Sequence, residues 1–120
     1  MKTVTTKSQL KKAVNDHEDK IIITGKLAKS MILAKKIATL GTVGIAILAT
    51  ALATAPVTGG LSFVAAAPIA ASVGLETSVV IAVVAVGGVI IVLAICKDYN
   101  IKVTGKNAKG EAIELELTRK

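Results

Sequence analysis

Two uncharged stretches decide the predicted fold: residues 77–96 read TSVVIAVVAVGGVIIVLAIC, and residues 37–55 read IATLGTVGIAILATALATA. Neither contains an acidic or basic side chain. As helices they would be about 30 Å and about 28 Å long, which matches the hydrocarbon thickness of a bilayer. The sequence therefore predicts two membrane spans, at about 37–55 and 77–96.

Apart from Glu76, charge is confined to the flanks of this apolar middle. Residues 1–36 carry nine lysines and three acids, and residues 97–120 carry six basic residues and four acids. A hydrophobic fraction of 52% and a mean hydropathy of +0.68 argue against a soluble enzyme or a disordered chain. Because lysines precede the first span and follow the second, the positive-inside rule predicts that both termini lie in the cytoplasm.

The segment between the spans is apolar but ill suited to crossing a membrane. Residues 56–75 read PVTGGLSFVAAAPIAASVGL, and their longest expected helix, 61–73, should be interrupted at Pro68. We expect a re-entrant or interfacial helix on the outer side. The predicted fold class is thus a membrane α+β protein with a two-span transmembrane helical hairpin, and residues 31–96 form its membrane block.

The two flanks predict a small cytosolic module. Residues 1–30 are predicted to form a βαβ segment. It consists of a β-branched stretch at 3–6, a helix at about 7–17 that begins with a capping box from Thr6 to Gln9, and a strand at 20–24. In residues 97–120, alternating stretches at 99–104 and 111–118 form a β-hairpin around the turn at 106–110. We expect the hairpin to complete one sheet with the βαβ segment.

Small residues on the predicted spans suggest close helix packing. The first span repeats them every four residues, and the second has a glycine pair at its centre. They could pack the two helices of one chain together, or face other copies or a wet lumen. These candidate packing and oligomerisation residues are Ala38, Thr42, Ala46, Thr50, Thr54, Gly87 and Gly88.

The charged residues near the membrane block have two candidate roles. Glu76 could mark the outer headgroup region, or form a ring at the mouth of an oligomeric pore that favours cations. The juxtamembrane lysines should contact anionic lipid, and nucleic acid is not an expected partner because aromatic stacking groups are scarce. The lysines are Lys26, Lys29, Lys35, Lys36 and Lys97.

Nothing in the sequence predicts catalysis. His17 is the single histidine and Cys96 the single cysteine, so no metal-ligand set, catalytic residue set or disulfide can be assembled. We expect no enzyme activity, no metal and no cofactor.

Three short motifs resemble a group of small bacterial inner-membrane proteins. They are TGGLS at 58–62, AAAP at 65–68 and KDY at 97–99, within a similarity that covers about residues 56–100. The chain has a looser likeness to pore-forming membrane effectors of prophages or phage defence. The resemblance implies a bacterial inner-membrane protein and no particular activity or site residue.

Three functions are compatible with these features. The leading prediction is a homo-oligomeric, pore-forming effector, for example in antiviral defence, whose cytosolic module responds to a cytosolic protein trigger. The alternatives are a structural membrane anchor that presents the module to a partner protein, and a holin-like protein.

Overall fold

The amino-terminal flank forms the predicted strand, helix and strand. In this computed structural model, which describes residues 2–54 and 63–120, β1 (Lys2–Val4) is followed by α1 (Lys7–Asn15) and β2 (Lys20–Thr24). The predicted capping box is confirmed, because the Gln9 N–H donates to Thr6 Oγ1 at 3.3 Å and Gln9 Oε1 accepts from the Thr6 N–H at 3.3 Å. The helix ends two residues earlier than predicted, before His17, which has a φ of 55°.

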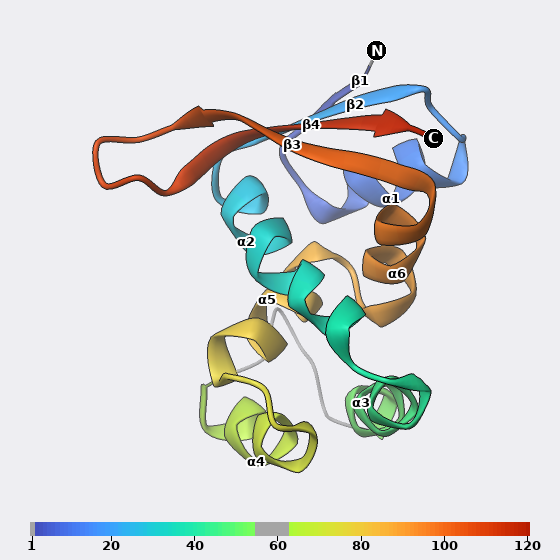
Figure 1. Cartoon of the computed structure of the whole chain (residues 1–120), viewed down its shortest axis with the longest axis vertical. Coiled ribbons are helices and arrows are strands. Elements are labelled where there is room, and N and C mark those ends of the chain that lie inside the picture. Colours follow the sequence, from blue (N-terminus) through green and yellow to red (C-terminus); the bar gives the residue numbers. More distant parts are fainter. Residues whose placement is uncertain (1, 55–62) are drawn as a thin grey trace.

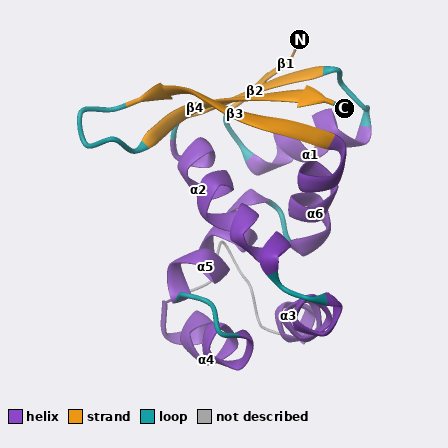
Figure 2. Ribbon diagram, in the orientation of Figure 1, coloured by secondary structure: helices purple, strands orange, loops and turns teal. Residues whose placement is uncertain are grey.

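The carboxy-terminal flank completes the sheet, as predicted. Strands β3 (Tyr99–Lys106) and β4 (Ala112–Arg119) form an antiparallel hairpin, and the sheet order is β1-β2-β4-β3. β4 also pairs antiparallel with β2, placing Ile21 opposite Leu117 and Ile23 opposite Leu115. The two ends of the chain therefore share one sheet, and both termini lie at it (Figure 2).

Six α-helices and one 3-10 helix occur in the described residues. After α1 come α2 (Lys26–Ala34), the 3-10 helix η1 (Lys35–Thr39), α3 (Thr42–Thr54), α4 (Phe63–Val73), α5 (Thr77–Val86) and α6 (Val89–Asp98). Helices α1, α2 and α6 cover one face of the sheet, whereas α3 and α4 lie at the opposite end of the molecule (Figure 1). Helix α5 packs against both α2 and α4 and so connects the two parts.

The predicted two-span helical hairpin is wrong. Within 37–55 the backbone leaves the helical conformation at Leu40, with φ −72° and ψ 146°, so that η1 ends and α3 begins separately. Within 77–96 Gly87 and Gly88 have φ values of 130° and 110°, which end α5 and start α6 after a sharp turn. Both departures divide an apolar stretch into helices of 13 residues or fewer.

No single helix in the described parts of the chain is long and apolar enough to cross a membrane. The helices Val64–Val73 and Thr77–Val86 are together long and apolar enough for a membrane span, but they are bent by 107° relative to each other.

The physical reason for this correction is that the Val- and Ile-rich stretch packs inside the protein. Helix α5 buries five of its ten residues and lies against α2, whose Met31 is fully buried. Helix α6 buries Ile91, Val92 and Ile95 beside η1 and the sheet. Side chains that were expected to face lipid therefore form the hydrophobic core of an α+β globule.

The interruption expected at Pro68 is not found. Helix α4 runs through Pro68 without interruption. The start of the predicted helix at 61 and the TGGLS stretch at 58–62 lie outside the described residues.

Candidate functional site

An uncharged lobe lies at the end of the molecule that is farthest from the sheet. It consists of α3 and α4, which contact each other (Figure 1). The sequence between Lys36 and Glu76 contains no acidic or basic residue. We call the described residues of these two helices the α3–α4 lobe.

The α3–α4 lobe exposes large apolar side chains to solvent. Val64 on α4 is 84% exposed, and Val43 and Ile47 on α3 are 74% and 44% exposed. Leu48 is the one fully buried residue among those of α3 whose side chains are described. Apolar surface in water is unfavourable by about 25 cal/mol per Å². Exposed apolar side chains on two neighbouring helices therefore favour a contact surface.

Exposed lysines on η1 and α1 lie next to α3, whereas those of α2 lie beside α5 and the hairpin. One pocket lies between two lysines of α1 and the helix α3, and a second lies between two lysines of α2 and the helix α5. Two further lysines belong to η1, immediately before α3. These six exposed lysines, which we call the lysine collar, are Lys7, Lys11, Lys26, Lys29, Lys35 and Lys36.

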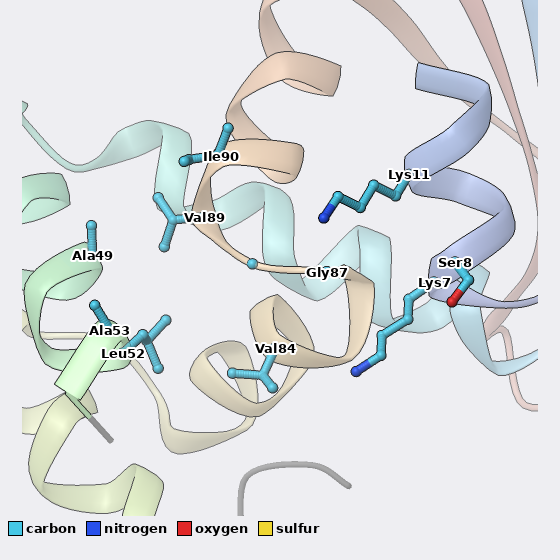
Figure 3. Close-up of a pocket in the computed structure, with 11 residues that line it drawn as sticks. Lys7, Ser8, Lys11, Ala49, Leu52, Ala53, Val84, Gly87, Val89 and Ile90 are labelled. Carbon is cyan, nitrogen blue, oxygen red and sulfur yellow. The ribbon is translucent and has the colours of Figure 1, made fainter. Parts of the chain in front are cut away.

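The larger pocket has one polar and one apolar wall. It encloses about 540 Å³, with Lys7, Ser8 and Lys11 of α1 on the polar wall. The apolar wall combines residues of α3 with those of the turn between α5 and α6 (Figure 3). We call this the α1–α3 pocket; it could accommodate a ligand that has both a charged and an apolar part.

The predicted packing residues are separated in the structure. Thr42, Ala46 and Thr50 lie on the exposed side of α3, whereas Ala38 is exposed in η1 beyond the break at Leu40. Thr54 ends α3, and its side chain lies outside the described part. Gly87 and Gly88 form the α5–α6 turn and line the α1–α3 pocket instead of packing within one span. Their role in oligomerisation stays a prediction.

The predicted charged sites are not brought together at one place. Glu76 is exposed at the amino-terminal cap of α5. Lys26 and Lys29 line the smaller pocket, where Lys29 forms an ion pair with Glu111 of the hairpin. Lys97 lies in the last turn of α6, away from the lobe.

Three titratable groups have environments that shift their pKa. Burial raises the pKa of the Tyr99 phenol, whose hydroxyl donates a 2.6 Å hydrogen bond to the Glu18 carbonyl. Burial also raises the pKa of the half-buried Cys96 thiol, and nearby Lys35 and Lys120 partly oppose that shift. A thiol with a raised pKa is mostly protonated at neutral pH and is a poor nucleophile. Hydrogen bonds from Lys29 and Asn107 lower the pKa of Glu111.

These groups do not gather into a metal-ligand cluster in the described residues. Across residues 2–54 and 63–120, no three His, Cys, Asp or Glu side chains are close enough to hold a metal ion. His17 is exposed in the turn after α1. The features that could take part in binding are the α3–α4 lobe, the lysine collar and the α1–α3 pocket.

The sequence did not identify the lysines of α1 as candidate site residues. Lys7 and Lys11 are four positions apart and therefore share one helix face, which adjoins the face of the buried Leu10 and Val14. That spacing was visible in the sequence. What could not be read from it is that this face is turned toward α3 and the α5–α6 turn.

A family model described as uncharacterised protein PM1101 matches residues 3–120. No match was found among curated proteins or among solved structures.

Proposed function

We propose that this chain, which belongs to the PM1101 family, is a peripheral membrane protein that attaches to an anionic lipid surface through its α3–α4 lobe. The four-stranded sheet of β1 to β4, which we call the sheet module, would then face away from the lipid and be presented to other molecules. The observation that carries this proposal is the exposure of Val43 and Val64 on an uncharged lobe.

The apolar contribution comes from the two most exposed valines of the lobe. They lie on α3 and α4, which contact each other, and the proposal requires that both enter one lipid interface. Full burial of a valine side chain is favourable by about 1.5 kcal/mol or more. Partitioning of the protein into the lipid interface should therefore depend strongly on these two side chains.

The electrostatic contribution comes from the lysine collar. A lysine close to an anionic membrane surface adds about 1 kcal/mol of attraction, which salt weakens. Of the collar, Lys29 already pairs with Glu111. In the described part of the chain Lys7, Lys11, Lys35 and Lys36 have no ion-pair partner and lie next to α3, so they remain available to headgroups.

Sedimentation with lipid vesicles tests this proposal. The protein should bind vesicles that contain phosphatidylglycerol more tightly than pure phosphatidylcholine vesicles, and high salt should reduce the difference. Replacing Val43→Glu and Val64→Glu together should lower binding about tenfold or more, because each glutamate would have to enter the lipid interface.

The matched control is Val103→Glu. Val103 is also an exposed apolar residue, but it lies on β3 in the sheet module, far from the α3–α4 lobe (Figure 1). This variant should keep its vesicle binding. Equal binding by the lobe variant and the control would overturn the proposal.

Self-assembly is a second candidate function, supported by the exposure of Ala38, Thr42 and Ala46. These small side chains would allow close approach of a second copy, and pore formation remains a proposal on that basis. The test is the inner-membrane potential of bacteria that express the protein, read with a voltage-sensitive dye. Ala46→Leu combined with Thr50→Leu should abolish any depolarisation that depends on close helix contacts; depolarisation retained in this variant would argue against self-assembly through α3.

A further inference from the structure

The α1–α3 pocket is separate from the surface that we propose to enter lipid. On α3, Leu52 lies about half a helical turn away from Val43 in projection, at 100° per residue. Leu52 lines the pocket, whereas Val43 is 74% exposed on the other side of the helix. The pocket can therefore bind a ligand independently of the attachment of the lobe to a membrane.

The charged residues of the pocket's polar wall are both cationic. Lys7 and Lys11 extend from α1 toward the α5–α6 turn (Figure 3), and no carboxylate lines the pocket. Neither lysine has an ion-pair partner in residues 2–54 and 63–120. Two unpaired ammonium groups at the mouth of one pocket favour an anion.

The opposite wall is apolar. Leu52 of α3, Val84 of α5 and the first two residues of α6, Val89 and Ile90, line it. In Figure 3 their side chains lie across the pocket from the lysines. Ile90 is 82% exposed, so this wall continues onto the molecular surface and can hold a chain that extends out of the pocket.

Gly87 and Gly88 add no side chain to the pocket between its polar and apolar walls. Gly87 and Gly88 adopt φ values of 130° and 110°, which side chains rarely allow, and a Cβ at Gly88 would meet no atom within 4 Å. The backbone at this turn therefore leaves free space beside the lysines.

We infer that the α1–α3 pocket binds a single-chain amphipathic anion, of the chemical class of a free fatty acid. The carboxylate contacts Lys7 and Lys11, and the hydrocarbon chain lies along Leu52, Val84 and Ile90. A volume of about 540 Å³ falls in the range of small-molecule sites. The charged and apolar walls together select this class over a purely apolar molecule or an inorganic anion.

The test is a fluorescence titration of the full chain with dansyl-undecanoate in the absence of vesicles. Binding should enhance the fluorescence of the dansyl group, and dodecanoate should displace the probe. Dodecanol, which has the same chain but no charge, should compete at least about tenfold less well, because it lacks the charge-assisted bonds to the lysines.

Lys7→Gln combined with Lys11→Gln should weaken binding about tenfold or more. Lys12→Gln combined with Lys109→Gln changes the net charge equally at exposed positions outside the pocket, and it should bind normally. Ile90→Glu, which places a carboxylate at an exposed position of the apolar wall, should also abolish binding. Far-ultraviolet circular dichroism of each variant checks that its fold is unchanged.

The outcomes separate this site from membrane attachment. Val43→Glu with Val64→Glu should lose vesicle binding but keep its affinity for dansyl-undecanoate. Equal affinities of the lysine variant and its charge-matched control, or equal competition by dodecanol, would overturn the inferred site. Binding to vesicles without any binding of the free probe would also overturn it, while leaving the lobe as the lipid contact.

Discussion

The sheet module and the α3–α4 lobe use apolar residues in opposite ways. In the sheet, Ile21 and Ile23 of β2 face Leu117 and Leu115 of β4, and all four side chains are fully buried. The polar residues of the same strands point to the other face, where Lys20 and Glu116 form a 3.1 Å ion pair. In the lobe, apolar residues surround each helix, and Val43 and Val64 remain mostly in solvent.

This difference shows which sequence pattern allows an element to bury its apolar side chains within the chain's own fold. A strand that alternates apolar and polar residues has one face for the core and one for water. An entirely apolar helix has no face that water solvates well, so a single layer of neighbours leaves part of it exposed. The lobe is therefore the region of the molecule that gains most from a further contact.

The largest expected contrast is in the cost of truncating apolar side chains. Leu117→Ala should reduce the free energy of unfolding by about 2–5 kcal/mol, because it leaves a cavity in the core. Val64→Ala should change it by less than about 0.5 kcal/mol, because an exposed side chain packs against little. Urea denaturation measures both. A large loss for Val64→Ala would show that the lobe is packed against something and would break the comparison.

The next contrast concerns the turn between α5 and α6. Alanine in place of Gly87 or Gly88 should destabilise the protein by about 1–3 kcal/mol, because both residues have φ values above 100°. If residues 77–96 formed one continuous helix, the same changes would stabilise it by about 0.5–1 kcal/mol. Thermal unfolding of the two variants gives the sign. Gly44→Ala, inside α3, is a control with helical backbone in both arrangements.

A smaller effect is expected at the junction of α6 with the sheet. Tyr99 is 3% exposed, and its hydroxyl ties the start of β3 to the turn after α1 through the Glu18 carbonyl. Tyr99→Phe should cost about 1 kcal/mol, because it removes a hydrogen bond to a partly buried carbonyl. Thr104→Val removes an exposed hydrogen bond to Glu114 and should cost less in the same denaturation experiment.

The smallest effect is a pH dependence at the link between α2 and the hairpin. Hydrogen bonds from Lys29 and Asn107 lower the pKa of Glu111 in the folded protein. The unfolded chain therefore binds a proton more readily, so this carboxylate stabilises the fold above the ordinary glutamate pKa of about 4.3. The contribution disappears as the pH falls through the lowered folded pKa.

Lys29→Gln should move the pKa of Glu111 back toward its ordinary value, as measured by an NMR titration of the side-chain carboxyl carbon. Lys26→Gln, on the same turn of α2 but with no part in this ion pair, should leave the titration unchanged. The effect on stability should be slight, since ion pairs at the surface contribute little. An unaltered Glu111 titration in Lys29→Gln would show that the ion pair does not hold in solution.

Local patterns in the flanks were sufficient to predict their elements. The capping box at Thr6 and the alternation in 20–24 depend on neighbours within a few residues, and both are confirmed. The middle of the chain could not be predicted in this way. A run such as VVIAVVAV is equally suited to lipid and to a protein core, because both are apolar environments.

The candidate site depended even more on tertiary contacts. Lys7 and Lys11 were predicted on one helix, but the sequence did not indicate that they face Leu52 of α3 and the α5–α6 turn. The small-residue repeat from Ala38 to Thr54 suggested one helix face, but the break at Leu40 removes Ala38 from it.

The sequence by itself determined the segregation of charge, the βαβ segment, the hairpin and the absence of charge from the middle of the chain. Each follows from residue type and spacing over a few positions, where hydrogen bonding and side-chain alternation act locally. Only the tertiary structure decided that residues 77–96 turn at Gly87–Gly88 and pack beneath the sheet, while Val43 and Val64 stay exposed. The hydrophobic effect requires that apolar surface leave water, but it does not specify the neighbour that covers it.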